Sequence, residues 1–219
     1  MQLKKNLDTI IKEKMLDEMI EGSWSLGMQI SLDEIMEKYE VSRTPVIQAL
    51  KEFVALGVVT RTGKGHYFCQ DFSDEEIRDI IDIRLMLELE ALHRIMNKGS
   101  VELAQLAKTS DTCLASDKSD DTINTRRLDM QFHKQLVDLA GSTCLSDIYS
   151  RVQIKFMMVN YMLGSHTAIQ QGIACQDHAM IVKYIRKNDV KSAEEVVTKH
   201  INGAYSKIRK RFADERLGA

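Results

Sequence analysis

Proline and cysteine are scarce in this chain. A single proline among 219 residues favours a mainly helical protein, because proline interrupts helices. The four cysteines are widely separated and form no Cys-x-x-Cys pair, which argues against a disulfide framework and against a thiolate zinc site. We therefore expect all four thiols to be reduced and mostly buried.

Long apolar runs and a strong net charge are also missing. No run approaches the roughly 20 apolar residues of a membrane span, and the N-terminus leads into an amphipathic helix instead of a signal peptide. We expect a cytoplasmic protein with no membrane partner. The net charge of −2 hides an uneven distribution, since residues 41–70 carry one acid, Glu52, and four basic residues. A local basic face of this kind indicates contact with nucleic-acid phosphates.

Residues 1–70 predict a winged helix-turn-helix domain. Apolar residues recur at helical spacing in residues 3–20 and again in 46–56, and a capping box at Ser31 starts a short helix between them. After Gly57 two β-prone runs flank a Thr-Gly-Lys-Gly tip, which predicts a small β-hairpin. In a winged helix the third helix fits the major groove, about 12 Å wide, and the hairpin reaches the neighbouring backbone or minor groove.

Several short motifs in this domain resemble the GntR family of bacterial transcription regulators. They are Val41-Ser42-Arg43-Thr44-Pro45-Val46, Ala49-Leu50, Leu56-Gly57 and the Gly63-Lys64-Gly65 wing. The resemblance implies that the recognition helix and the wing contact a double-stranded DNA operator. The residues that we expect to contact DNA are Arg43, Thr44 and Gln48 in the helix and Lys64 and His66 in the wing.

The sequence departs from the family pattern at two places. Ile47-Gln48 stands where the family has Arg-Glu, and Asp33 stands where an arginine that contacts DNA is common. The loss of two cations would weaken phosphate binding and change the base sequence that is read. A binding module that no longer engages DNA therefore remains an alternative.

Residues 73–213 predict an all-α bundle of about six helices. The boundary falls at residues 70–73, because Ser73-Asp74-Glu75-Glu76 forms a capping box that opens a new helix. The expected helices cover residues 73–97, 100–116, 121–140, 143–164, 168–187 and 189–213. Bundles of this kind build their binding sites inward from facing helices.

A carboxylate and three imidazoles are placed to meet inside this bundle. Asp129 and His133 are four residues apart, so both side chains lie on one face of a helix. His178 and His200 are nearly equidistant from a tight turn at Asn188-Asp189, which sets them at the same height on two antiparallel helices. Such a set suits zinc, nickel, manganese or iron and leaves coordination positions open. The alternative is that His178 and His200 are core histidines with ordinary hydrogen bonds.

The second domain resembles the FCD-type effector domain of the FadR-like subfamily, which follows GntR-type winged helices. The resemblance implies that Asp129, His133, His178 and His200 hold a divalent metal ion, with zinc expected first. It also matches Arg84 to an arginine that faces the effector pocket in relatives, where a guanidinium would bind a carboxylate. The alternative for Arg84 is a structural ion pair with Glu88 or Asp82.

These observations predict a metal-containing, ligand-responsive DNA-binding regulator. We expect a homodimer, so that two recognition helices meet two half-sites, and an effector that is a small organic acid such as a sugar acid or another carboxylate. The alternative is a metal-dependent hydrolase or lyase that acts on small carboxylates. The sequence contains no His-Glu-x-x-His motif, nucleophile elbow or carboxylate placed as a general base, so we expect no enzyme.

Overall fold

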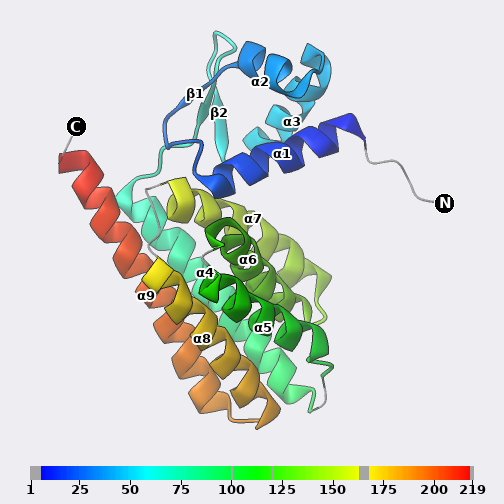
Figure 1. The fold of residues 1–219 in the computed structure, drawn as a ribbon, viewed down its shortest axis with the longest axis vertical. Helices are drawn as coiled ribbons and strands as arrows, with labels where there is room; N and C mark the ends of the chain where they lie inside the picture. Colours follow the sequence, from blue (N-terminus) through cyan, green and yellow to red (C-terminus); the bar gives the residue numbers. More distant parts are fainter. Residues whose placement is uncertain (1–5, 100, 120, 163–167, 218–219) are drawn as a thin grey trace.

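The fold has two parts, a small helix-and-sheet domain and a bundle of long helices (Figure 1). A computed structural model describes residues 6–99, 101–119, 121–162 and 168–217. The prediction of a mainly α protein, with a winged helix-turn-helix followed by an all-α bundle, is confirmed. None of the helices in these ranges combines the length and apolar character that a membrane crossing requires.

The small domain contains three helices and a three-stranded antiparallel sheet. Its elements are α1 (Leu7–Glu21), β1 (Gln29–Ile30), α2 (Leu32–Tyr39), α3 (Arg43–Ala55), β2 (Val59–Arg61) and β3 (Tyr67–Cys69). The strand order is β1-β3-β2, so the predicted hairpin gains an extra strand in which Gln29 lies opposite Phe68. Two residues are too few to show an alternating pattern, which explains why the sequence did not predict β1.

Local sequence signals account for the helix-turn-helix. The Ser31 side chain accepts a hydrogen bond from the Glu34 amide and caps α2. The turn before α3 places Glu40 in the left-handed region, with φ of 54°. Helix α3 then buries one apolar stripe completely, since Val46 and Phe53 are 0 % exposed. The opposite face of α3 is left to solvent, where it can meet DNA.

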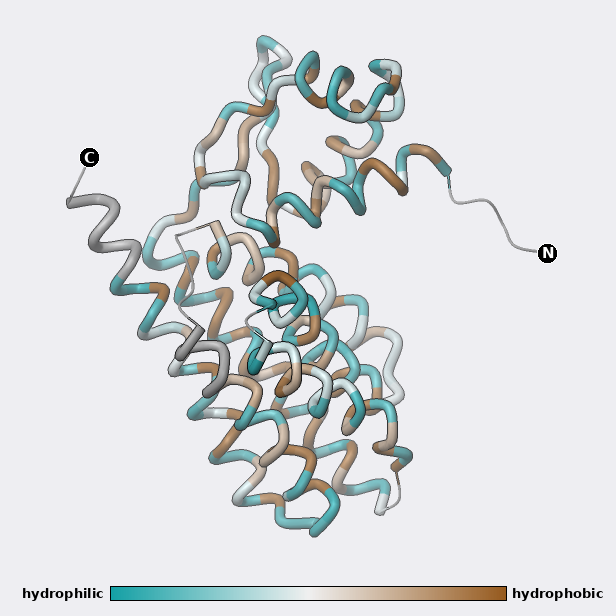
Figure 2. Tube along the Cα trace, viewed as in Figure 1, coloured by the Kyte–Doolittle hydropathy of each residue, from teal (hydrophilic) through white to brown (hydrophobic). Residues whose placement is uncertain are grey.

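Within the described residues the bundle consists of six helices, as the sequence predicted. They are α4 (Asp74–Asn97), α5 (Ala104–Lys118), α6 (Thr122–Asp138), α7 (Thr143–Met162), α8 (Ala168–Arg186) and α9 (Val190–Leu217). A complete capping box between Ser73 and Glu76 begins α4, and Asn188, with φ of 52°, turns α8 back into α9. Hydrophobic positions alternate with hydrophilic ones along each bundle helix, as expected for helices buried on one side (Figure 2).

Helix α1 joins the two domains. It packs against α3 on one side and against α6 and α7 on the other (Figure 1). One continuous cluster of buried apolar residues spans both domains and includes Met15 of α1, Phe53 of α3 and Met157 of α7, and a smaller cluster lies within the bundle. Arg127 of α6 adds ion pairs with two acids of α1, Asp17 and Glu21. A displacement of α6 would therefore also displace α1, the helix that packs against α3.

The expectation of four reduced thiols is wrong in one respect. Cys113 of α5 and Cys175 of α8 form a disulfide, with their Cα atoms 5.7 Å apart. Cys69 is free and buried, and Cys144 is free and exposed. A separation of 62 residues gave no sign of the pairing, which arises because α5 packs along α8.

Candidate functional site

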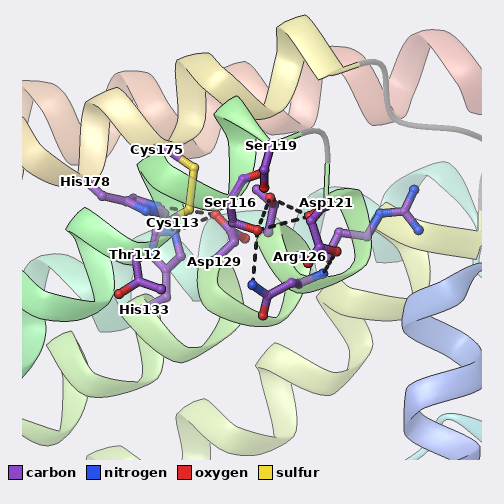
Figure 3. Close-up of a disulfide and its surroundings, with 12 residues drawn as sticks. Thr112, Cys113, Ser116, Ser119, Asp121, Arg126, Asp129, His133, Cys175 and His178 are labelled. Atoms are coloured by element: carbon purple, nitrogen blue, oxygen red, sulfur yellow. Dashed lines mark hydrogen bonds and ion pairs between the residues drawn. A yellow bond between two sulfur atoms is a disulfide. The ribbon is translucent and has the colours of Figure 1, made fainter.

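Four side chains from three helices converge inside the bundle. Asp129 and His133 come from α6, His178 from α8 and His200 from α9, and one ligand atom of each lies within 4.8 Å of the others. His133 Nε2 lies 3.0 Å from His200 Nε2 and 3.2 Å from His178 Nε2. Asp129 Oδ1 lies 3.3 Å from His178 Nε2 and 3.7 Å from His133 Nε2. Figure 3 shows Asp129, His133 and His178 turned toward one another beside the disulfide.

These separations fit a common metal ion. Ligand atoms placed about 2.0–2.2 Å from one metal lie about 3.0–3.5 Å from their neighbours, which is close to the separations of 3.0–3.7 Å between His133, its two imidazole neighbours and Asp129. His133 and His178 are each 0 % exposed, so the cluster is closed to bulk water on that side. Four protein ligands, three of them imidazoles, suit zinc and its first-row neighbours.

Two carboxylates hold the far nitrogens of two imidazoles. Glu88 of α4 lies 2.8 Å from His133 Nδ1, and Asp177 of α8 lies 3.3 Å from His200 Nδ1. A carboxylate at this position sets the tautomer so that Nε2 presents its lone pair to a metal. Neither residue was predicted in this role. Asp177 precedes His178 in the sequence but serves His200, a partnership that only the packing of α8 on α9 reveals.

The protonation states of Asp129 and His178 also suit metal binding. Burial lowers the pKa of His178, and the neighbouring imidazoles lower it further, whereas Asp129 raises it. The net result is a pKa of about 4, so this ring is neutral at pH 7. Burial alone would raise the pKa of Asp129, but its hydrogen bonds to His133 and His178 hold it well below the usual range. Burial lowers the pKa of His133, but the charge of Glu88 together with the hydrogen bonds to Asp129 and Glu88 outweighs burial, and the net shift is upward. The cluster thus supplies an ionised carboxylate and, in His178, a neutral imidazole.

Arg84 forms the ion pair that the sequence left open as an alternative. Its Nε donates to Glu88 Oε1 at 2.8 Å, and its guanidinium lies 3.8 Å from the centre of the Phe156 ring. The Tyr149 hydroxyl donates to the same Glu88 oxygen at 2.8 Å. Arg84 is only 2 % exposed but also lines the cavity beside the cluster. It therefore orients Glu88, and through it His133, from the edge of the cavity.

A cavity of about 260 Å³ opens next to the cluster. Its wall includes two cluster residues, Asp129 and His200. Its charged side chains are the bases Arg84, Arg126, Lys199 and Lys207 and the acids Asp129 and Asp177. With twice as many bases as acids, the cavity favours an anion.

The residues predicted to contact DNA all lie on the surface of the small domain. Arg43, Thr44 and Gln48 are exposed along the outer face of α3, and Lys64 and His66 are exposed at the hairpin. The hairpin tip is held by a bond from the Thr62 amide to the His66 carbonyl, 2.9 Å long. These five side chains are thus presented by a rigid helix and a short, braced turn.

The two departures from the family pattern have different surroundings. Asp33 is exposed on α2, where a carboxylate would repel a phosphate, whereas Ile47 is half-buried on α3.

Comparison with known proteins agrees with this anatomy. The family "Bacterial regulatory proteins, gntR family" matches residues 8–68, and the FCD domain family matches residues 79–203, more than half of the chain. The chain is 23 % identical to the HTH-type transcriptional regulator YdhC of Bacillus subtilis, over 83 % of this chain and 81 % of the relative. It is 22 % identical to the gluconate operon transcriptional repressor of Bacillus subtilis, over 77 % of this chain and 76 % of the relative.

A solved structure shares the whole architecture. The Escherichia coli protein McbR/YncC superposes with a TM-score of 0.83, at 12 % identity, over 95 % of this chain and 99 % of that chain. At this identity the likeness concerns the fold alone. The family matches, the relatives and the architecture agree, and the chain belongs to the GntR family of bacterial transcription regulators, in the subfamily that carries an FCD domain.

Proposed function

We propose that this regulator holds a divalent metal ion in its bundle and uses it to sense a small organic acid. The observation that carries the proposal is the convergence of Asp129, His133, His178 and His200, with neighbouring ligand atoms 3.0–3.7 Å apart. Zinc is the first candidate, with nickel, manganese and iron as alternatives. The metal would supply a Lewis-acidic coordination position for an oxygen ligand.

The cavity supports an acid as the effector. It borders both Asp129 and His200, so an anion inside it would reach the metal, while the surplus of basic side chains would balance its charge. Arg84 remains our candidate for a direct contact, although its pairing with Glu88 makes it a weaker donor than a free guanidinium. The operon named for the gluconate repressor supports a sugar acid among the candidates.

We propose that the working form is a homodimer bound to a DNA operator in the bacterial cytoplasm. Two recognition helices related by a two-fold axis would meet two half-sites one or more helical turns apart. Ile83 and Met86 on the outer side of α4 are 44 % and 69 % exposed in the single chain. Large apolar side chains at such exposure support a subunit contact on α4.

Elemental analysis of the purified protein tests the metal centre. We expect one metal ion per chain, and for His178→Ala a loss of at least about 100-fold in metal affinity together with a lower Tm, since even the outer partners of a ligand are worth 10–100-fold. The matched control is His93→Ala, because His93 pairs with Glu194 outside the cluster and should leave metal content unchanged. An unchanged ratio of metal to protein in His178→Ala would refute the site.

Operator binding is tested separately by a mobility-shift assay with the DNA upstream of the protein's own gene. We expect binding that weakens as salt is raised, because Arg43 and Lys64 would release counterions from phosphates. The absence of salt-sensitive binding would count against the DNA-binding role, whatever the metal content.

A further inference from the structure

Arg126 is a buried cation without an acidic partner in the described part of the chain. It lies on α6, lines the cavity and is 7 % exposed. Its Nε is buried and has no hydrogen-bond partner among the described residues, and its guanidinium stands 5.1 Å from the centre of the Tyr161 ring. Burial lowers the pKa of Arg126. An uncompensated buried charge is costly, so an anion that entered the cavity would gain by meeting it.

The other end of the same guanidinium holds the DNA-binding domain. Arg126 Nη1 donates to the carbonyl oxygen of Ile20 at 2.6 Å, 106 residues away. Ile20 lies in the last turn of α1, where carbonyl groups lack partners within the helix. In Figure 3 the Arg126 side chain extends away from the cluster toward the helix at the edge of the view. Helix α1 packs against α3 and also shares with it an ion pair between Lys12 and Glu52.

Arg126 also stands close to the metal cluster. Asp129 follows it by three residues on α6, which is a rise of about 4.5 Å along the helix. Tyr161 connects the two, since its hydroxyl lies 3.5 Å from Asp129 Oδ2 and its ring faces Arg126. Asp129, His200 and Arg126 all line the cavity, so a molecule long enough to span it would contact the cluster and Arg126 together.

We infer that Arg126 is a second anion site of the cavity and that it couples occupation of the cavity to α1. The inference rests on the proposed function and narrows the effector class to an acid with two anionic groups, one directed to the metal centre and the other to Arg126 Nε. When the second group binds, the guanidinium reorients and its bond to the Ile20 carbonyl changes. Helix α1 then shifts, and the shift changes the orientation in which α3 meets DNA.

Two sugar acids that differ by one carboxylate test the anion site. D-glucarate carries a carboxylate at each end, whereas D-gluconate carries one and ends in a hydroxymethyl group. We expect the zinc-loaded full chain to bind D-glucarate at least tenfold more tightly than D-gluconate in isothermal titration calorimetry. Arg126→Gln should remove this preference while leaving zinc content unchanged. Arg126→Lys keeps the positive charge and should retain part of the preference for D-glucarate. This variant therefore distinguishes loss of the anion site from a folding defect.

Arg127→Gln is the matched control, because Arg127 is exposed and pairs with α1 through Asp17 and Glu21 but does not line the cavity. It should keep the full preference for D-glucarate. Equal binding of the two sugar acids by the wild-type chain, or an unchanged preference in Arg126→Gln, would overturn the anion site. If the protein holds no zinc, the metal centre fails, and the preference measured without metal still decides the role of Arg126.

Hydrogen exchange tests the coupling. The amides of Gly22 and Ser23 close the end of α1 through bonds to Met19 and Glu18. D-glucarate should change the exchange rate of these two amides at least twofold in the wild type and in Arg127→Gln, but not in Arg126→Gln. Binding of D-glucarate with no change at these amides in the wild type would overturn the coupling and leave the anion site standing.

Discussion

The DNA-binding face and the bundle interior place their functional residues in opposite environments. Arg43, Gln48 and Lys64 project into solvent from separate points of a rigid scaffold, and each would act on its own phosphate or base. Glu88 and His133 are 0 % exposed, and each depends on the other for its charge and orientation. Substitutions on the first surface should therefore have small and additive effects, whereas substitutions in the second network should have large and coupled ones.

The sharpest contrast comes from Glu88→Gln. The change leaves Arg84 as a buried charge without its partner and removes the carboxylate that orients His133. We expect a loss of about 3–5 kcal/mol in the free energy of unfolding and a 10–100-fold loss in metal affinity. Chemical denaturation and metal titration measure the two effects.

The control for this substitution is Glu90→Gln, two residues after Glu88 on α4. It breaks the exposed ion pair between Glu90 and Arg94. An exposed pair is worth less than about 1 kcal/mol, so stability should hardly change. Equal losses of unfolding free energy in Glu88→Gln and Glu90→Gln would contradict the coupling of Glu88 to its buried neighbours.

Loss of the Cys113–Cys175 disulfide should come next in size. The bond ties α5 to α8 and closes a loop of 62 residues, and Cys175 lies one turn before His178. We expect Cys175→Ser to lower the free energy of unfolding by about 2–4 kcal/mol. Cys144→Ser, at an exposed free thiol, should have no comparable effect. Four titratable thiols in the protein unfolded without reductant would show that the bond does not form.

Acidification should destabilise the metal-free protein. The pKa of His178 is lowered from 6.5 to about 4, so between these values the unfolded chain binds a proton that the folded chain does not. Stability should therefore fall as the pH drops from 6.5 to 4, by on the order of 2–3 kcal/mol, with His133 offsetting part of the loss. Urea denaturation in the presence of chelator measures the loss. His178→Gln should flatten the slope, and a profile identical to that of the wild type would assign the effect elsewhere.

The smallest effect belongs to the wing. Lys64→Ala should weaken DNA binding only a few-fold at any sequence and lower the salt slope by about 1, as expected for the loss of one phosphate contact. Lys108→Ala removes an exposed cation of α5, far along the chain from the DNA-binding face, and should change neither quantity. A loss of DNA affinity larger than about tenfold for Lys64→Ala would indicate that the contacts of the wing depend on one another, as those of the bundle interior do.

Periodic and local features could be predicted from the sequence. The helices have apolar stripes and capping residues within a few positions of each other, so Ser31, Ser73 and the Asn188-Asp189 turn marked real helix boundaries. The convergence of the four cluster residues was also anticipated, because spacing paired Asp129 with His133 and His178 with His200, and the resemblance to the FCD-type domain joined the two pairs. The roles of Arg43, Thr44, Gln48, Lys64 and His66 in DNA binding stay predictions.

The sequence by itself determined the two-domain helical architecture, because helix and strand periods are local, and its resemblance to the FCD-type domain singled out the four residues that converge in the bundle. Only the tertiary structure decided how these residues are used. The partnership of Glu88 with His133, the disulfide between α5 and α8, and the reach of Arg126 to Ile20 join residues 45, 62 and 106 positions apart. Contacts at such separations follow from the packing of whole helices, and no local pattern records them.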